Sequence, residues 1–378
     1  MGRSDQPTPE LPATPASPAA GAAFGPDGGH GQDLCEALAA QVRQAHDGRV
    51  PLCIRGGGTK RHLAPPCAGE PLDVARHHGI VSYEPSELVL TARAGTPLAV
   101  VEAVLAAAGQ MLPFEPPAFG AAATLGGTIA CGSAGPRRPW GGAVRDAVLG
   151  VQMINGAGER LTFGGQVMKN VAGYDVSRLM AGARGVLGVL TQVSVKVLPR
   201  AETEVTCVLS LDRQAALAKV VAWNRSPLPL SATCHVDGLL SVRLSGADVA
   251  VRAAAASIGG ERLAQGPAFW HGLKEQTLPF FAAGAELWRY SLPHAAPMPR
   301  AAGAWLIEWA GAQRWLCRAA GAGAEEAAPA AEAASLGGHA QRWRHLWWET
   351  PPGAAQSAVQ ARLKLAFDPR GIFNPAPA

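Results

Sequence analysis

The sequence lacks three features, each of which would have indicated a class of protein. No window approaches the roughly 20 consecutive apolar residues of a membrane-spanning helix, so we expect a soluble chain. The formal net charge is only +4 over 378 residues, without long blocks of one sign, and this does not favour nucleic-acid binding. No two of the seven cysteines form a CxxC pair, so we predict no zinc site, no iron–sulfur cluster and no other metal. Such widely spaced cysteines are expected to be free thiols in a reducing cytoplasm.

Large apolar side chains are almost absent from residues 1–32, where Pro, Ala and Gly predominate. Such a segment cannot bury enough apolar surface to offset the entropy of ordering it, so we predict a disordered tail. The same residues lack the apolar central region of a secretory signal, which favours a cytoplasmic protein.

Glycine, by contrast, is abundant, and it is clustered between residues 123 and 200. Three groups occur there, around Gly126–Gly135, Gly164–Gly173 and Gly182–Gly188, separated by the β-branched apolar runs 148–154 and 189–197. Glycine permits positive φ and lets the backbone contact a flat ligand without an intervening Cβ. Glycine count alone is also typical of hairpin turns in any α/β protein, so this pattern needs support from elsewhere in the chain.

Residues 50–60 give that support, because a short apolar strand is followed at once by the turn Arg55-Gly-Gly-Gly-Thr-Lys60. Successive glycine N–H groups can converge on an anion, and the flanking cations add charge-assisted contacts to a phosphate. The turn matches neither a Walker A loop nor a GxGxxG fingerprint. Around it, the spacing predicts helices over 33–45 and 98–108 and a strand over 88–94.

Several motifs in this order carry a family resemblance: RGGGT, TARAGTPL, GQMLPFEPP, ATLGGTIACGSAG, VMKNVAGYDVSRLM with GARGVLGVLT, and FDPRGIFNP near the C-terminus. Together they resemble the FAD-binding domain of the p-cresol methylhydroxylase/vanillyl-alcohol oxidase (PCMH-type) superfamily. Within it, the chain is most similar to the FAD-binding E subunit of bacterial glycolate oxidase (glycolate dehydrogenase). The resemblance covers residues 34 to 375, roughly.

The resemblance implies an α+β fold. A PCMH-type FAD-binding domain of two subdomains would span residues 33–200, with the cofactor between the subdomains. An α+β cap with an antiparallel sheet would span 201–345, and residues 346–378 would return to the FAD domain, with Phe373 and Asn374 near the cofactor. In the cap we expect a hairpin across Asp237-Gly238, helices on one side of the sheet, a helix interrupted at Pro329, and Trp223, Trp305 and Trp309 in the core.

The resemblance also implies a set of FAD contacts. Residues Arg55 to Thr59 would hold the pyrophosphate, and the two later groups would approach the rest of the cofactor. The full set is Arg55, Gly56, Gly57, Gly58, Thr59, Pro116, Thr124, Gly126, Gly127, Thr128, Gly132, Gly185, Gly188 and Val189. Some relatives attach the flavin to a histidine in the first loop; this loop has none, so we predict non-covalent FAD. His62, just after the loop, is expected to be exposed, and Cys131 is expected to be a small buried thiol.

Relatives that oxidise 2-hydroxy acids directly carry a GHxGDGNxH-type motif in the cap, and none of the ten histidines here has that arrangement. His271, His294 and His339 are isolated candidates, His339 the strongest, and the resemblance assigns no catalytic residue. The implied function is therefore the FAD-binding subunit of a multi-subunit glycolate (D-2-hydroxy acid) dehydrogenase. Its partners would be a related FAD-linked subunit with the histidine motif and an iron–sulfur subunit, and membrane attachment would come only through them.

Two alternatives remain open from the residues. One is a self-sufficient flavin oxidoreductase on another small carboxylate, with Arg137, Arg138 or Arg289 binding the acid. The other is a non-catalytic scaffold with a vestigial flavin site, against which the intact RGGGT loop counts.

Overall fold

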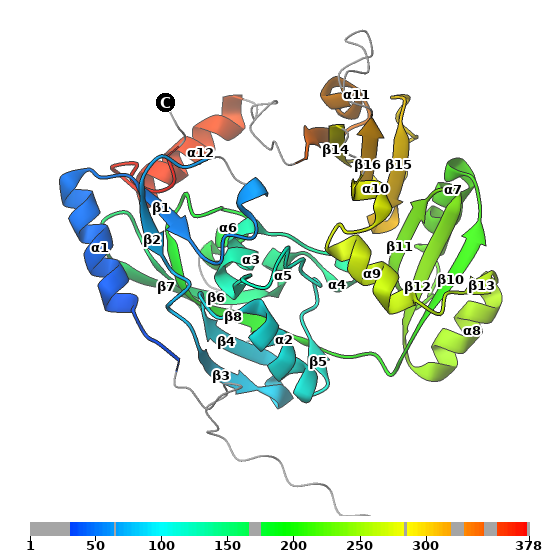
Figure 1. Ribbon diagram of the computed structural model, residues 1–378, viewed down its shortest axis with the longest axis horizontal. Helices are drawn as coiled ribbons and strands as arrows, with labels where there is room; N and C mark the ends of the chain where they lie inside the picture. The colour runs from blue at the N-terminus through cyan, green and yellow to red at the C-terminus, as the bar shows by residue number, and fades with distance from the viewer. Residues whose placement is uncertain are drawn as a thin grey trace, which may run out of the picture.

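The computed structural model describes residues 31–63, 66–165, 175–282, 286–318, 329–343 and 354–375. Outside these ranges lie most of the N-terminal tail for which we predicted disorder, residues 167–174 of the VMKNVAGYD motif, and the boundary that we predicted at 345. Figure 1 shows the described chain as two neighbouring parts, an N-terminal lobe and a cap.

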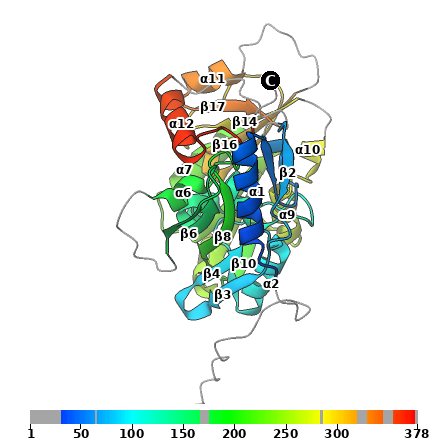
Figure 2. The same cartoon turned by 90° about the vertical axis from the view of Figure 1, so that its left-hand side faces the viewer.

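The N-terminal lobe begins with a small layer of one helix and two strands. Helix α1 (Cys35–Gly48) packs its buried face on the lobe core, and Asp33 Oδ1 accepts a hydrogen bond from the Cys35 N–H at its start. Strands β1 (Leu52–Arg55) and β2 (Glu70–Asp73) pair in parallel. Figure 2 views the molecule from this side, with α1 in front.

A five-stranded sheet forms the larger layer of the lobe, in the order β3-β4-β8-β6-β7, with every neighbouring pair antiparallel. Its strands are β3 (Ile80–Glu84), β4 (Val89–Arg93), β6 (Val148–Ile154), β7 (Arg160–Gly164) and β8 (Val189–Lys196). The associated elements are α2 (Leu98–Ala107), α3 (Leu125–Cys131), α4 (Arg138–Gly141), α5 (Val144–Ala147), α6 (Val176–Met180) and the short pair β5 (Gln110–Met111) with β9 (Leu198–Pro199). The predicted helix over 98–108 and strand over 88–94 are confirmed.

The cap is an eight-stranded antiparallel sheet in the order β13-β10-β12-β11-β15-β16-β14-β17. Its strands are β10 (Thr203–Ser210), β11 (Leu230–Val236), β12 (Leu239–Gly246), β13 (Glu261–Arg262), β14 (Glu286–Ser291), β15 (Ala304–Glu308), β16 (Gln313–Arg318) and β17 (His339–Arg342). The helices are α7 (Arg213–Trp223), α8 (Asp248–Ile258), α9 (Gly266–Lys274), α10 (Pro279–Ala282) and α11 (Pro329–Ser335). The β11–β12 hairpin turns at Asp237-Gly238, as predicted.

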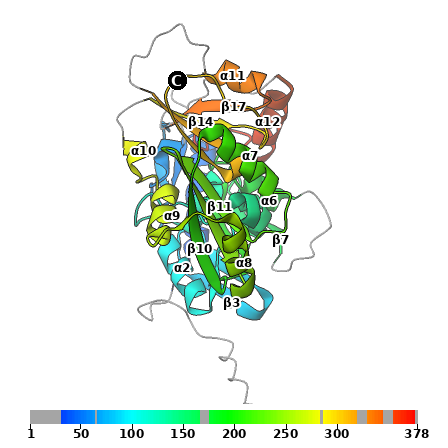
Figure 3. The same cartoon turned by 90° about the vertical axis from the view of Figure 1, so that its right-hand side faces the viewer.

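One cap prediction was wrong in detail. Helices cover both faces of the sheet: α7 and α8 pack in the cluster around Val242, whereas Trp270 of α9 and Phe281 of α10 pack in a second cluster with Cys234. Figure 3 views α7 and α8 from the outer side of the cap. Helix α11 is described from Pro329 onward, and residues 321–328, where we expected the part of the helix before the interruption, lie outside the described residues.

The end of the chain returns to the N-terminal lobe, as predicted. Helix α12 (Ala354–Phe367) is followed by Phe373, which is fully buried and bridges Leu52 of β1 in parallel. Asp368 fixes this return, because its buried carboxylate accepts hydrogen bonds from the Ile372 and Phe373 N–H groups and from Lys364 Nζ.

The expectation of seven free thiols was wrong for two of them. Cys53 and Cys67 form a disulfide, with their Cα atoms 5.8 Å apart. Cys53 lies in β1 and Cys67 lies just before β2, so the parallel pairing of those strands brings the two side chains together. Among the described residues, no helix is long and apolar enough to cross a membrane.

Candidate functional site

The RGGGT turn lies directly against residues 120–124. A Cβ added to Gly57 would lie 1.4 Å from the Ala122 carbonyl oxygen, and one added to Gly56 would lie 2.6 Å from Thr124 Oγ1. Glycine is therefore required here by a close approach of backbone to backbone. Thr59 Oγ1 donates its proton to the Ala118 carbonyl at 2.7 Å, so in this conformation the hydroxyl has no proton left for a phosphate.

The second glycine group forms the start and end of α3. Thr124 caps the helix by accepting a hydrogen bond from the Gly127 N–H, and Gly126 packs so closely on Ala94 that a Cβ would lie 2.6 Å from the alanine Cβ. Gly132 ends the helix with φ +62°, a conformation that favours glycine. The start of α3 is thus pressed against the end of β4.

The third group is joined to the first two by hydrogen bonds. The Gly182 and Arg184 N–H groups donate to the Ile129 and Ala130 carbonyls of α3. Asn374 closes the arrangement from the C-terminal end: its Oδ1 accepts from the Ile54 N–H and its Nδ2 donates to the Arg184 carbonyl, each at 2.8 Å. Strand β1, the turn after α6 and the C-terminal segment therefore meet at one place.

Several polar groups at this place are unsatisfied. In the part of the chain that the structure describes, the N–H groups of Gly56, Gly57, Gly58 and Gly185 donate to no protein acceptor. Among the same residues, the fully buried Thr128 hydroxyl has no hydrogen-bond partner. Gly185 and Thr128 are buried, Gly56 and Gly57 are half-buried, and Gly58 is exposed. Unpaired buried polar groups are costly, so the groups of Gly185 and Thr128 indicate a place that a polar ligand would complete.

A buried lysine lies between the loop and the cap. Lys60 is 6% exposed, its Nζ donates to the Ala118 carbonyl, and burial lowers its pKa. Burial raises the pKa of the partly buried Cys131 thiol, against the opposing charges of Lys60 and Arg184. The expectation that His62 is exposed was wrong: it is half-buried, with its ring edge-on to Phe119 and Trp343.

Ion pairs join the two parts of the molecule. Arg243 of the cap makes a bidentate contact with Glu115, each oxygen at 2.8 Å, while its guanidinium stacks on Trp270. The arginine holds the pKa of the Glu115 carboxyl below its usual range despite burial. Arg137 belongs to the same network, since its side chain pairs with Glu204 at 3.1 Å. It is therefore engaged structurally, which weakens its case as a substrate ligand.

Three other arginines at the junction have no such partners within the part of the chain that the structure describes. Arg138 follows α3, Arg184 lies in the Gly182–Gly188 turn, and Arg289 extends from β14 of the cap. The Arg138 and Arg289 guanidinium carbons lie 4.6 and 5.8 Å from the centre of the Trp309 ring. Burial and the nearby charges of Arg138 and Arg184 lower the pKa of Arg289 to about 10, although Glu308 opposes the shift.

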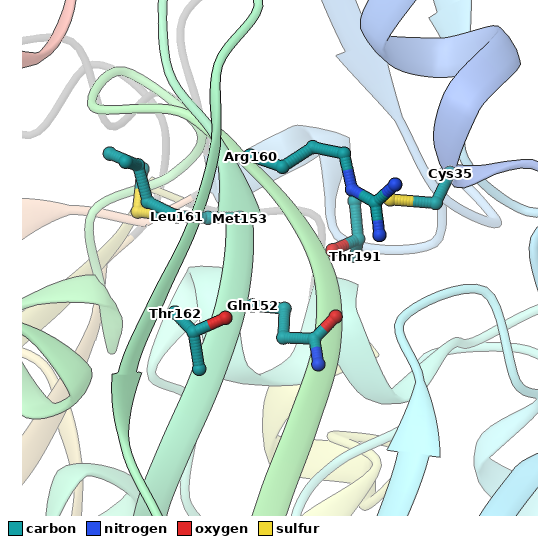
Figure 4. Close-up of a pocket in the computed structure, with 7 residues that line it drawn as sticks. All are labelled: Cys35, Gln152, Met153, Arg160, Leu161, Thr162 and Thr191. Carbon is teal, nitrogen blue, oxygen red and sulfur yellow. The ribbon is translucent and has the colours of Figure 1, made fainter.

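A separate hollow lies elsewhere in the N-terminal lobe. It has a volume of about 410 Å³ and is lined by residues of β6, β7 and β8 together with Cys35 and Arg160 (Figure 4). None of the predicted FAD contacts lines it, and no glycine turn opens onto it. We therefore place the candidate site at the glycine turns and the junction.

Comparison with known proteins identifies the family of the chain. Residues 35–164 match the family model described as an FAD binding domain. The chain is 48% identical over 344 residues to glycolate oxidase subunit GlcE of Escherichia coli, covering 91% of this chain and 97% of that protein. The chain belongs to the glycolate oxidase subunit GlcE family.

Two further relatives extend the comparison. Glycolate oxidase subunit GlcD of Bacillus subtilis is 31% identical over 176 residues, which are 46% of this chain and 37% of that subunit. A solved structure of alkyldihydroxyacetonephosphate synthase superimposes with a TM-score of 0.64 at 15% identity, over 91% of this chain and 76% of that one. The predicted α+β, PCMH-type fold is thereby confirmed.

The cofactor of this GlcE-family chain is FAD. The residues at the candidate site fit it, because free backbone N–H groups suit a diphosphate and the orphaned Thr128 hydroxyl suits a polar ring atom. The individual FAD contacts stay predictions, and the predicted residues differ in whether they carry a free polar group. Gly56, Gly57, Gly58, Gly185 and Thr128 have free polar groups, whereas Arg55 is exposed, Pro116 is buried and Val189 is a buried core residue at the start of β8.

Sequence reasoning included Lys60 as a cation flanking the glycine turn but missed Phe119 and Arg184 as members of the site. Phe119 and Arg184 adopt positive φ (+53° and +52°), which only the coordinates reveal. For Lys60, the position directly after the glycine turn was a usable signal.

Proposed function

We propose that this chain is the FAD-binding subunit of a multi-subunit glycolate (D-2-hydroxy acid) dehydrogenase that oxidises glycolate to glyoxylate. The observation that carries the proposal is the 48% identity over nearly the whole length of a protein named as a glycolate oxidase subunit. The weaker relationship to subunit GlcD supports a related FAD-linked partner. An iron–sulfur partner that accepts the electrons completes the proposal, since the chain has no cysteine spacing that could hold a cluster.

Bound FAD supplies a hydride acceptor, and a base must then take the substrate hydroxyl proton from within hydrogen-bond reach. The three candidate histidines are poorly placed for that role. His271 is exposed on α9, and His294 Nδ1 lies 3.2 Å from the Ala310 carbonyl. His339 is exposed on β17 with no carboxylate partner among the described residues, and partial burial of the ring, followed by the charge of Arg289, lowers its pKa. We therefore assign proton abstraction to the related FAD-linked subunit.

A second candidate function is a self-sufficient FAD oxidoreductase on another small carboxylate. The convergence of Arg138 and Arg289 on Trp309 favours it, because guanidinium groups bind planar carboxylates. The scaffold alternative is less well supported, since the free N–H groups of the glycine turn remain in place.

We expect the purified chain to be yellow and to release all of its FAD on acid precipitation. The reason is that the loop Arg55–Lys60 offers no histidine for a covalent bond. The absorbance of the supernatant and pellet near the flavin maximum measures the two fractions. A yellow pellet would contradict non-covalent binding, and a colourless chain that cannot be reconstituted with FAD would support the scaffold alternative.

A further inference from the structure

The guanidinium groups of Arg138, Arg184 and Arg289, which we call the arginine cluster, are uncompensated. Among the described residues none of the three has a hydrogen bond or an ion pair to an acidic side chain, although each is only partly exposed. Every other cation in the junction has a partner: Arg243 pairs with Glu115, Arg137 with Glu204, and Lys60 donates to a carbonyl. Burying positive charge without a counter-charge costs free energy, so we expect the arginine cluster to bind an anion.

The acidic groups near the cluster do not cancel it. Glu308 acts on Arg289 from the cap sheet, but one of its oxygens already accepts from Gln313 Nε2 and Trp315 Nε1, each at 2.7 Å. Burial raises the pKa of the Glu308 carboxyl. Asp146 acts on Arg138, but it is exposed and its Oδ2 already accepts from the Ala143 N–H at 2.9 Å. Lys60 adds a further positive charge on the lobe side, beside Cys131 and Arg184.

The surrounding backbone is strained at the same place. Trp309, whose ring lies beneath Arg138 and Arg289, has φ +52°, and Arg184 has φ +52°; both conformations are rare for large side chains. The Trp309 indole is held by a hydrogen bond from its Nε1 to the Gly135 carbonyl at 3.0 Å. Strain of this kind persists where surrounding structure enforces it, commonly at ligand sites. Arg138 and Arg289 are thus held on a rigid aromatic surface.

We propose that the arginine cluster binds the carboxylate of a small organic acid within this chain, beside the glycine turns. The planar fork of a guanidinium matches a planar carboxylate better than a tetrahedral anion. Three guanidinium groups have only hydrogen-bond donors, so they favour an acid whose polar groups are negatively charged or accept hydrogen bonds. The site deepens the proposed function and rests on it, because the acid would lie next to the Arg184 turn that we assign to FAD. The GlcE-family chain would then hold an acid without supplying the base that oxidises it.

The test is calorimetric titration of the FAD-loaded full chain with oxalate, a carboxylate that has no hydrogen to transfer. We expect oxalate to bind, and Arg289→Met and Arg138→Met each to weaken binding about tenfold or more, as expected for the loss of a charged hydrogen-bond donor. Arg252→Met is the matched control, since Arg252 lies on the exposed face of α8 and pairs only with Asp248. FAD content and unfolding temperature are measured for each variant to show that it is folded. If Arg289→Met does not fold, the binding of oxalate by Arg138→Met decides the result.

Three results would overturn the proposal: no oxalate binding by FAD-loaded wild-type chain, full binding by both variants, or equal binding of sulfate. If the wild-type chain did not bind oxalate and Arg289→Met no longer associated with the related FAD-linked subunit, the cluster would instead be a contact with that subunit. A wild-type chain that holds no FAD would contradict the proposed function instead, and titration of that chain would still decide whether the arginines bind oxalate.

Discussion

Gly57→Asp is expected to lower FAD retention by more than about tenfold, which corresponds to a loss of about 1.4 kcal/mol of binding free energy. A side chain at this position collides with the Ala122 carbonyl, because the added Cβ would lie 1.4 Å from its oxygen. Residue 57 must therefore move away from residues 120–124. In addition, the new carboxylate would stand among the free N–H groups of Gly56, Gly57 and Gly58 and compete with a phosphate for them.

The control separates the collision from the charge. Gly57→Ala introduces the same Cβ without a carboxylate, so the difference between the two variants measures the electrostatic part. Gly246→Ala, at the end of β12, makes only ordinary contacts, the closest at 3.5 Å from Pro229, and should retain FAD like the wild type. FAD per chain is read from the absorbance spectrum after gel filtration. Wild-type FAD content in Gly57→Asp would mean that the turn has another function.

Arg243→Met is expected to cause the largest loss of stability, about 3–5 kcal/mol, because removal of one partner of a buried pair leaves the other charge uncompensated. The bidentate contact with Glu115 is the closest ion pair between cap and lobe, and the Arg243 side chain is only 2% exposed. Glu115 also accepts a hydrogen bond from the Arg137 N–H. A displacement of the Glu115 side chain would therefore disturb the backbone directly before Arg138.

Urea unfolding measures this loss, with Arg252→Met as the control that removes an exposed ion pair of α8. The double variant Arg243→Met/Glu115→Leu should recover much of the stability, since it no longer buries an unpaired carboxylate. If Arg243→Met were no less stable than Arg252→Met, the pair would not hold the cap against the N-terminal lobe.

Much of the fold could be predicted from local sequence signals. The Asp237-Gly238 turn between two β-branched runs is a hairpin signal that depends on few residues, and it gave the β11–β12 pairing correctly. Helix α2 was likewise defined by Pro97 before it and Gly109 after it. Other features depend on residues far apart in the chain. The Cys53–Cys67 disulfide follows from the pairing of β1 with β2, and the contact of Gly57 with Ala122 joins residues whose separation carries no sequence signal.

The arginine cluster illustrates the same limit at the candidate site. Arg138 and Arg289 were noticed as possible carboxylate ligands, but so was Arg137, and the sequence has no means of ranking them. The structure separates them through their partners, because Arg137 pairs with Glu204 while Arg138 and Arg289 share the Trp309 ring. Arg184 could be added only when the turn after α6 was seen to lie beside α3.

The most direct test of the proposed function is anaerobic addition of glycolate to the FAD-loaded chain while the flavin spectrum is recorded. We expect the isolated chain to keep its oxidised spectrum, because the chain lacks the GHxGDGNxH-type histidine motif of relatives that oxidise 2-hydroxy acids directly. We expect bleaching once the related FAD-linked subunit is added. Rapid bleaching of the isolated chain, lost in His339→Ala, would contradict the account and make this subunit the one that oxidises the acid.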